Sequence, residues 1–165
     1  MTEEAQDRAA IIKKWWEDLQ DNRAARAKLR HAGSLQSALR QQATYDLANR
    51  LGAKLQDMPT IALIAAVLAC VREDTPDISV ARALGAPQEQ PLCSGMRFER
   101  LIDAAEGDAQ ITAFRRALAL LSNGANVKNL ASSLLQWNNP IWGERYRQKW
   151  LYDYFKADNP AQNPS

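Results

Sequence analysis

Apolar residues recur along this chain at intervals of three and four, which is the spacing that lines one face of an α-helix. In the first such segment, residues 5–19, Ile12, Trp16 and Leu19 fall on one face, and acidic residues near its start suit the helix dipole. The same spacing predicts seven further helices, over residues 23–30, 39–51, 59–71, 98–105, 111–121, 130–137 and 142–155.

No segment alternates convincingly with the period of two that marks a half-buried strand, and runs of β-branched residues are missing. Hydrophobic residues make up 46% of the chain and charged residues 24%, which is ordinary for a globular protein. We therefore predict an all-α fold, a compact bundle of about eight helices. The side chains expected in its core are Trp16, Leu19, Leu63, Leu68, Phe98, Leu101, Leu118, Leu121 and Trp150.

The length of 165 residues suits one domain with its own hydrophobic core. We expect a single helical domain over residues 1–156, either undivided or built as two sub-bundles, 5–72 and 95–156, that share a core. The last residues, 157–165, are rich in Asn and Pro, and we predict that they are disordered.

The connection over residues 73–95 is polar and contains three of the seven prolines. We expect a long loop here, interrupted by a short helix over residues 80–84.

The longest apolar run, residues 61–71, is much shorter than the roughly 20 residues that cross a bilayer. The first residues are polar and acidic, unlike a signal peptide. We expect no membrane contact and a cytoplasmic location.

The sequence offers little from which to build an active site. His31 is the only histidine, and Cys70 and Cys93 lack the spacing of a zinc site. The acidic stretch 73–77 is more typical of a solvated loop than of a magnesium site. We predict no catalytic residue, no metal and no cofactor, and retain as a weaker alternative a small nucleic-acid enzyme that uses His31 or the acidic stretch.

The positive charge is unevenly distributed. Residues 21–56 contain seven Lys or Arg residues against two acidic ones, although the formal net charge of the whole chain is only +2. Within this basic segment Arg23, Arg26 and Arg30 project from one stripe of a helix, where they repel one another unless an anion lies across them.

Further arginines stand singly or in pairs within helical, otherwise apolar sequence between Ser79 and Leu121. A guanidinium group on a rigid helix is a planar, permanently charged fork of donors that suits a phosphate backbone. The ordinary alternative is a solvated, salt-bridged surface, in which Arg100 pairs with Glu99 or Asp103. The residues expected to contact phosphates are Arg26, Lys28, Arg30, Arg82, Arg97, Arg100, Arg115, Arg116 and Arg145.

The chain contains five tryptophans, which raises the question of base stacking. All lie on apolar helical stripes or at their ends, so core packing is the favoured interpretation. Trp142, between Pro140 and Gly143, is the one for which a stacking role stays open.

Several short motifs follow one another over residues 10–155. They are Trp16-Glu17-Asp18-Leu19 with a basic stretch after it, Ser79-x-x-Arg82-Ala83-Leu84, Arg97-Phe98-x-x-Leu101-Ile102, Phe114-Arg115-Arg116-Ala117-Leu118 and Trp137-x5-Gly143-x-Arg145-x-Arg147. Each is only a fragment of a helix. In their order and spacing, and in the length of the chain, the sequence resembles CasB, the small-subunit family of the type I-E CRISPR surveillance complex called Cascade.

This resemblance implies a non-enzymatic helical subunit that occurs as a pair inside Cascade, in contact with other subunits. It implies that the subunit contacts the guide RNA and the target-strand backbone and helps to bind the displaced non-target DNA strand. Basic positions of the family match Arg82, Arg97, Arg115, Arg116 and Arg145, and a basic pair matches the segment 26–30 after a gap. The acidic stretch 73–77 departs from the family, in which a more basic connection is expected.

A competing hypothesis from another class is a helical protein-interaction adaptor, whose arginines only solubilise it and whose exposed aromatic residues dock partner helices. The arrangement of the arginines distinguishes the two. For a nucleic-acid subunit we expect Arg82, Arg97, Arg115, Arg116 and Arg145 to converge on one face, with the stretch Glu73 to Asp77 away from it, because carboxylates there would repel the phosphates.

Overall fold

The computed structural model describes residues 3–156, so the disorder predicted for residues 157–165 lies outside the described part of the chain. The elements are α1 (Glu3–Gln20), α2 (Arg23–His31), α3 (Leu35–Ala38), α4 (Gln42–Leu51), η1 (Leu55–Asp57), α5 (Met58–Leu68), β1 (Glu73–Asp74), α6 (Val80–Gly85), α7 (Gly95–Ile102), α8 (Asp108–Leu120), β2 (Gly124–Ala125), α9 (Val127–Trp137) and α10 (Gly143–Phe155). Eight of these helices have seven or more residues, which confirms the predicted all-α fold.

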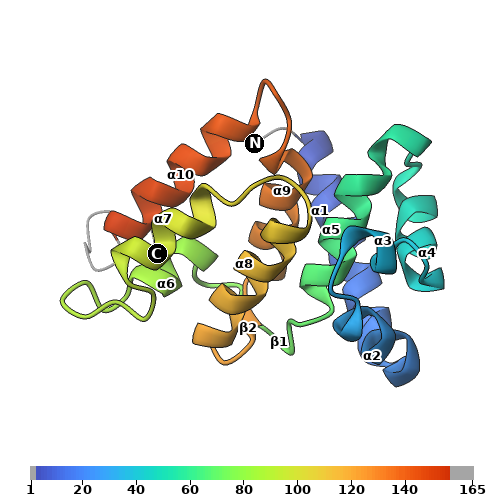
Figure 1. Cartoon of the computed structure of the whole chain (residues 1–165), viewed down its shortest axis with the longest axis horizontal. Helices are drawn as coiled ribbons and strands as arrows, with labels where there is room; N and C mark the ends of the chain where they lie inside the picture. Colours follow the sequence, from blue (N-terminus) through green and yellow to red (C-terminus); the bar gives the residue numbers. More distant parts are fainter. Residues whose placement is uncertain (1–2, 157–165) are drawn as a thin grey trace.

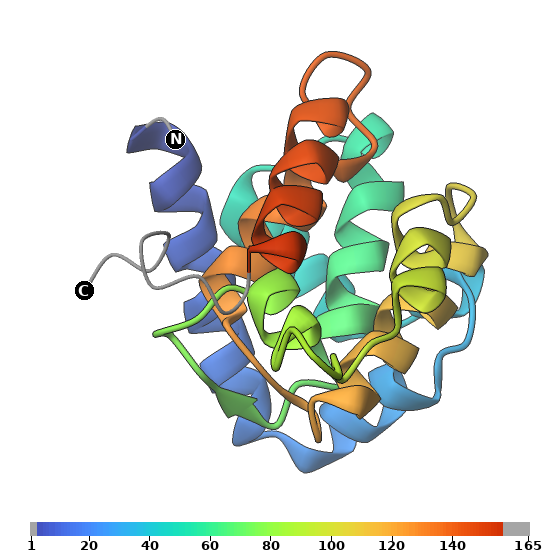
Figure 2. The same ribbon diagram turned by 90° about the vertical axis from the view of Figure 1, so that its left-hand side faces the viewer.

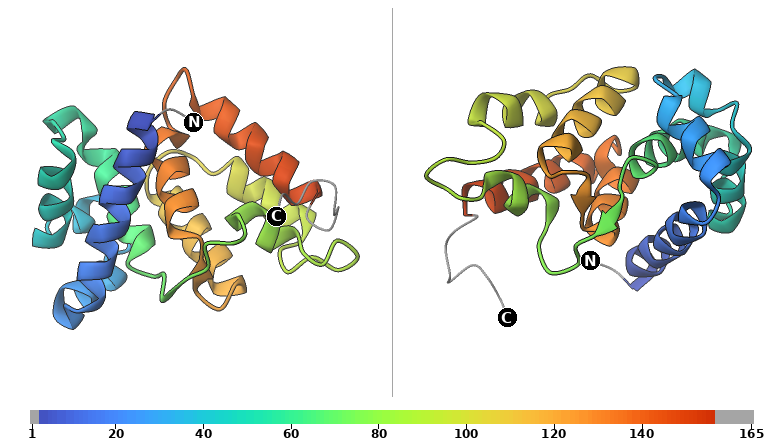
Figure 3. Two further views of the ribbon diagram at one scale, coloured as in Figure 1. Left: turned by 180° about the vertical axis from the view of Figure 1, so that it is seen from behind. Right: turned by 90° about the horizontal axis from the view of Figure 1, so that it is seen from below.

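Helices α1 to α5 lie on one side of the molecule and α6, α7 and α10 on the other, with α8 and α9 between them (Figure 1). From behind, α1 is seen to cross beside α9 (Figure 3). Buried residues from α1 through α10 belong to one continuous hydrophobic core. The middle helices therefore connect the two sides through packing rather than through a linker.

Helix α5 is the centre of the N-terminal side. Pro59 stands in its first turn, where the N–H that proline lacks is not needed. All residues of the run 61–69 are buried, and a helix that is apolar all round belongs in the interior. Helices α3, α4, α8 and α9 pack around it, as the apolar run in the sequence requires.

Two adjacent tryptophans fix α1 against this central helix. The rings of Trp15 and Trp16 are both buried. Trp15 Nε1 donates to the carbonyl oxygen of Ala43, and Trp16 Nε1 donates to that of Val71, each at 3.0 Å. Because a buried indole N–H needs an acceptor, the two bonds fix the position of α1 relative to α4 and to the end of α5.

A cluster of three aromatic rings joins α8, α9 and α10. Phe114, Trp137 and Trp150 pack edge to face, with ring centroids 5.1 to 5.8 Å apart. Trp150 Nε1 donates to Ser133 Oγ at 2.8 Å, so the polar atom of the buried indole is satisfied within the cluster. This cluster is the core of the C-terminal side.

Helix α6 lies directly against α10 (Figure 2). The approach is close because Gly85 has no side chain: a Cβ atom there would clash with the carbonyl group of Tyr154. Tyr154 in turn stacks on Phe98 with ring centroids 4.1 Å apart, and its hydroxyl donates to the carbonyl oxygen of Cys93 at 2.6 Å. The residues around α6 are therefore packed, although the sequence around them is polar.

The helix predicted over residues 39–51 is wrong at its beginning. The chain forms a separate short helix, α3, capped by Ser34, and α4 begins only at Gln42. Gln41 between them is extended, and the buried Thr44 Oγ1 donates to the carbonyl oxygen of Ala38 at 2.7 Å. These local side-chain bonds compete with a continuous helix.

The expected loop over residues 73–95 contains the predicted short helix, α6, but also a strand that was not predicted. β1 pairs in parallel with β2 in a sheet of two residues each. The pairing depends on a chain reversal after α8, where Ser122 and Asn123 adopt positive φ angles of 55° and 63°. The pairing of β1 with β2 joins segments that are distant in the sequence, so no local pattern of residues predicts it.

Eight of the nine residues predicted for the core are buried, and Leu121 is the exception, since it is only half-buried. The reason is that α8 ends at Leu120, so Leu121 no longer continues the apolar stripe of the helix.

Among residues 3–156, no single helix is both long and apolar enough to span a membrane. Helix α4 and the helical stretch 55–68 meet the criteria of length and apolarity only when they are taken together, and the bend between them is 119°.

Replacing Gly85 by Ala is expected to lower the free energy of unfolding by about 1–3 kcal/mol, because the added methyl group forces α6 away from α10. The matched control is Gly95→Ala, since nothing lies within 4 Å of a Cβ atom at Gly95. Urea titrations of both variants measure the difference. Equal stability of the two variants would contradict the close approach of the helices.

Candidate nucleic-acid interface

Four arginines gather around the C-terminal end of α5, and we refer to Arg26, Arg30, Arg72 and Arg115 as the arginine cluster. Arg26 and Arg30 come from α2, Arg72 from the segment that leaves α5, and Arg115 from α8. The carbonyl groups at the end of a helix have no partner within it and carry partial negative charge, so cations are favoured there. The local structure thus explains why positive groups collect at this point.

Arg115 is bound to the main chain of two other helices. Its Nη2 donates to the carbonyl oxygens of Leu29 and Ala66, both at 2.9 Å, and its Nε donates to Ala66 at 3.2 Å. The guanidinium is half-buried and holds the ends of α2 and α5 together.

Arg26 approaches the same helix end from α2. Its Nε lies 3.4 Å from the carbonyl oxygen of Ala69, whereas its Nη2 is buried and has no hydrogen-bond partner among the described residues. Burial lowers the pKa of Arg26 below its usual value, and the positive charges of Arg30 and Arg72 lower it further. Arg30 and Arg72 are exposed, so an anion bound to them would reduce the repulsion among the three cations.

Helix α2 positions these side chains. Its first turn is capped by Asn22, whose side-chain oxygen accepts from the backbone N–H of Ala25 at 3.1 Å. The buried Leu29 fixes the helix on the core, and Lys28, Arg30 and His31 occupy its last turn. Arg23, Arg26 and Arg30 therefore lie on one helix, as the sequence predicted. Of these three, Arg26 contacts the end of α5.

The remaining sequence-predicted residues lie on other elements. Lys28, Arg116, Arg97 and Arg100 are exposed, the last two on α7. Arg82, on α6, is half-buried, and its backbone N–H is capped by Ser79 Oγ at 3.2 Å. Arg145 is exposed at the start of α10. The structure thus brings three of the nine residues, Arg26, Arg30 and Arg115, to one helix end.

The salt-bridged alternative for Arg100 does not occur in the structure. Arg100 Nη2 lies 3.6 Å from Met96 Sδ, and no acidic side chain lies within 4.0 Å of it in the described part of the chain. Arg26, Arg115 and Arg145 likewise have no such acidic neighbour among residues 3–156. Internal carboxylates therefore do not neutralise these cations.

The convergence of Arg82, Arg97, Arg115, Arg116 and Arg145 stays a prediction. These residues come from four helices, α6, α7, α8 and α10. Arg115 is directed toward α2 and α5, whereas the guanidinium of Arg145 lies over the ring of Trp142, 5.5 Å from its centroid. Arg115 and Arg145 are thus in contact with different elements of the fold.

Sequence reasoning missed Arg72, which is not among the residues predicted to contact phosphates. The backbone N–H of Arg72 donates to the carbonyl oxygen of Asn123 at 2.8 Å, so the residue is held at the end of α5 by the reversal after α8. Its position just after an apolar helix, where a cation complements the dipole, was the available signal.

The acidic stretch has an architectural role. Asp74 forms an ion pair with Lys13 of α1 at 3.0 Å and accepts from the backbone N–H of Val127 at the start of α9 at 3.0 Å. The hydrogen bond and the charge of Asp74 raise the pKa of Lys13.

The side chain of His31 is exposed. The described residues contain no group of three His, Cys, Asp or Glu side chains placed to bind a metal ion.

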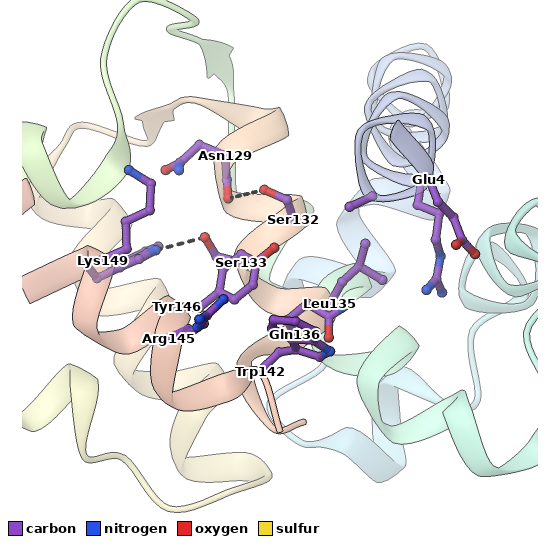
Figure 4. A pocket seen from close by; sticks show the side chains of 13 residues that line it. Glu4, Asn129, Ser132, Ser133, Leu135, Gln136, Trp142, Arg145, Tyr146 and Lys149 are labelled. Carbon is purple, nitrogen blue, oxygen red and sulfur yellow. Dashed lines mark hydrogen bonds between the residues drawn. The ribbon is translucent and has the colours of Figure 1, made fainter. Parts of the chain in front are cut away.

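A second candidate surface is a cleft of about 810 Å³ between the N-terminal part of α1 and α10, with α9 as its floor (Figure 4). Its cationic side chains are Arg8, Arg145 and Lys149, and Trp142 and Tyr146 are its partly exposed aromatic residues. Arg8 and Lys149 did not feature among the sequence predictions. No local pattern relates them, because α1 and α10 stand at opposite ends of the chain.

Comparison with known proteins agrees with this architecture. The family profile of CRISPR-associated protein Cse2 matches residues 25–155. The chain is also similar to a chain in the crystal structure of E. coli Cascade bound to a PAM-containing dsDNA target, with a TM-score of 0.67 and 21% sequence identity over 91% of this chain and 95% of that one. At that identity the similarity concerns the fold. No curated protein sequence matches.

Replacing Arg115 by Ala is expected to lower the free energy of unfolding by about 1–3 kcal/mol, because the carbonyl groups of Leu29 and Ala66 lose their donors. The matched control is Arg116→Ala on the same helix, which is exposed and should change stability by no more than about 0.5 kcal/mol. Both are measured by urea unfolding. Equal effects would show that α5 does not need the guanidinium of Arg115.

Proposed function

This chain belongs to the family of CRISPR-associated protein Cse2, and we propose that it acts as a non-catalytic, nucleic-acid-binding subunit of a Cascade-type surveillance complex. Cse2 and CasB are the same small subunit, so the resemblance noted in the sequence is confirmed. The proposal then concerns what this member of the family contacts and with which residues.

The partners proposed are other Cascade subunits, the guide RNA and both strands of the target DNA. The solved structure with the similar fold is described as Cascade bound to a double-stranded DNA target, which supports an assembly of this kind. We propose self-association as a pair inside the complex from the same family resemblance, and we keep the cytoplasmic location that was expected from the sequence. In such an assembly guide pairing reads the sequence, and the protein contacts backbones.

One observation carries the nucleic-acid role, the arginine cluster at the end of α5. Burial lowers the pKa of Arg26, and Arg30 and Arg72 lie close enough for their positive charges to lower it further. Both of these neighbours are exposed, and neither pairs with an acidic side chain within 4.0 Å among the described residues. Phosphate groups supply both the charge and the acceptor oxygens that such a site requires. Contacts of this kind bind all sequences alike and weaken with salt.

The protein-interaction adaptor remains the second candidate. Large apolar side chains are exposed on the side formed by α6, α7 and the end of α10, and they are Leu92, Met96 and Phe155. A subunit of a larger complex needs protein contacts as well as nucleic-acid contacts, so this surface is compatible with both hypotheses. The two hypotheses differ in one expected result: if the protein binds nucleic acid through the arginine cluster, replacing those arginines weakens the binding.

The double variant Arg30→Gln, Arg72→Gln is expected to bind a labelled single-stranded oligonucleotide more weakly than the parent, whatever its sequence, because phosphate contacts are lost. Both residues are exposed, so the fold should not be affected. The slope of log K against log salt should flatten by about 0.7 for each contact removed. Fluorescence anisotropy over a salt titration measures both quantities.

The matched control removes the same charge elsewhere, in the double variant Arg40→Gln, Lys54→Gln, whose residues are also exposed. It should keep a steeper salt slope than the cluster variant. If both double variants lose affinity equally, only the net charge matters, and the arginine cluster is not a phosphate site. If the parent binds no nucleic acid even at low salt, the adaptor hypothesis takes its place.

A further inference from the structure

We propose that the cleft between α1 and α10 binds an unpaired segment of single-stranded nucleic acid, with a base stacked on Trp142 and the adjoining phosphates bound by Arg145, Lys149 and Arg8. The inference rests on the proposed function for the class of its ligand. It goes further in naming a second site, remote from the arginine cluster, and the form of nucleic acid that the site accepts.

Trp142 is the first part of the argument. Its side chain is 46% exposed, whereas the other four tryptophans are at most 6% exposed and pack in the core. Its position is nevertheless fixed, because Asn139 Oδ1 accepts from the backbone N–H groups of Ile141 at 2.8 Å and Trp142 at 3.0 Å. The loop therefore presents a flat aromatic ring that the core does not use.

Arg145 completes this platform. Its guanidinium lies over the indole of Trp142 at 5.5 Å from the ring centroid, in a cation–π arrangement. The contact orients the exposed ring and places a positive charge beside it. An aromatic ring with an adjacent guanidinium is a combination that binds a base and its phosphate together.

The charges that line the cleft favour a polyanion. Arg8, Arg145 and Lys149 face it, against a single acidic residue, Glu4. Lys149 also lies 3.5 Å from Asp153, but its side chain is 63% exposed, so this surface ion pair is weak and can be exchanged for a phosphate. A basic or uncharged peptide would leave these cations without partners.

The floor of the cleft supplies polar groups. Asn129, Ser132 and Gln136 project from successive turns of α9, and Figure 4 shows them between α1 and α10. Asn129 Oδ1 already accepts from the backbone N–H of Val80 at 2.9 Å, and Ser132 Oγ donates to the carbonyl oxygen of Asn129 at 3.2 Å. The Asn129 amide can therefore still donate to a base, Ser132 Oγ can still accept, and the Gln136 amide can do both. Ser133 is already bonded to Trp150 Nε1 and so serves the core instead.

The size and shape of the cleft point to an unpaired strand. Its volume of about 810 Å³ is within the range of pockets that hold small organic ligands, so it accommodates a nucleotide or two but no duplex. In a duplex the bases are stacked on one another and cannot reach a protein ring. A base must be unpaired to lie on Trp142.

The test uses tryptophan fluorescence and binding of the full chain to oligothymidylate. Because Trp142 is the exposed tryptophan, quenching by a stacked base reports this residue. We expect quenching in the parent and none in Trp142→Leu. The affinity of Trp142→Leu for oligothymidylate should fall about fivefold or more, and its affinity for an abasic strand of equal length should be unchanged.

Two further variants separate stacking from charge and from general effects. Arg145→Gln should weaken binding of both the oligothymidylate and the abasic strand, because both carry phosphates. Phe155→Leu removes another exposed aromatic ring of α10, outside the cleft, and should bind like the parent. Circular dichroism establishes that each variant is folded.

The outcomes distinguish the two proposals. If Trp142→Leu binds and quenches like the parent while Arg30→Gln, Arg72→Gln loses affinity, the cleft is not a nucleic-acid site and the proposed function stands. If Trp142→Leu keeps its affinity but no longer joins the other Cascade subunits, the cleft is a protein contact, and the inference is overturned. If the parent binds no oligonucleotide, both proposals fail.

Discussion

The carbonyl end of α5 is the constraint on which the arrangement of this molecule depends. A helix with apolar residues on all sides must be buried, and its last carbonyl groups are then buried with it and need donors from elsewhere. Three side chains on other helices donate to carbonyl oxygens at this end or just beyond it: Arg115 to Ala66 in the last turn, Arg26 to Ala69, the C-cap, and Trp16 to Val71, two residues farther on. Satisfying one helix end thus holds α1, α2 and α8 in place and joins the two sides of the fold.

The side chains that bind these carbonyl groups also determine where positive charge is concentrated. Arginine combines a long apolar stem with several fixed donors, so it can satisfy buried carbonyl groups and still carry its charge near the surface. Arg26 and Arg115 do this from different helices, and Arg30 and Arg72 lie near Arg26 without an acidic partner within 4.0 Å among the described residues. A structural requirement of the core and a cationic surface therefore arise from one set of residues.

Hydrophobic periodicity predicted the helices and nearly all of the core because both follow from local spacing. It failed where the structure depends on distant partners. The break between α3 and α4 comes from side-chain bonds such as that of Thr44, and β1 exists only because β2 returns to it. For the site, the sequence identified Arg26, Arg30 and Arg115 as basic but not that Arg115 binds main-chain carbonyls. Arg8 and Lys149 meet in the cleft through folding alone.

The three hydrogen bonds of Arg115 also have a consequence for the entropy of binding. An exposed arginine such as Arg116 samples many rotamers, and ordering a side chain of this length on a ligand costs about 0.5–1.5 kcal/mol. The guanidinium of Arg115 is already ordered when the chain folds, because Leu29 and Ala66 hold two of its nitrogens. An anion that meets it encounters a preorganised cation, so little conformational freedom is left to lose.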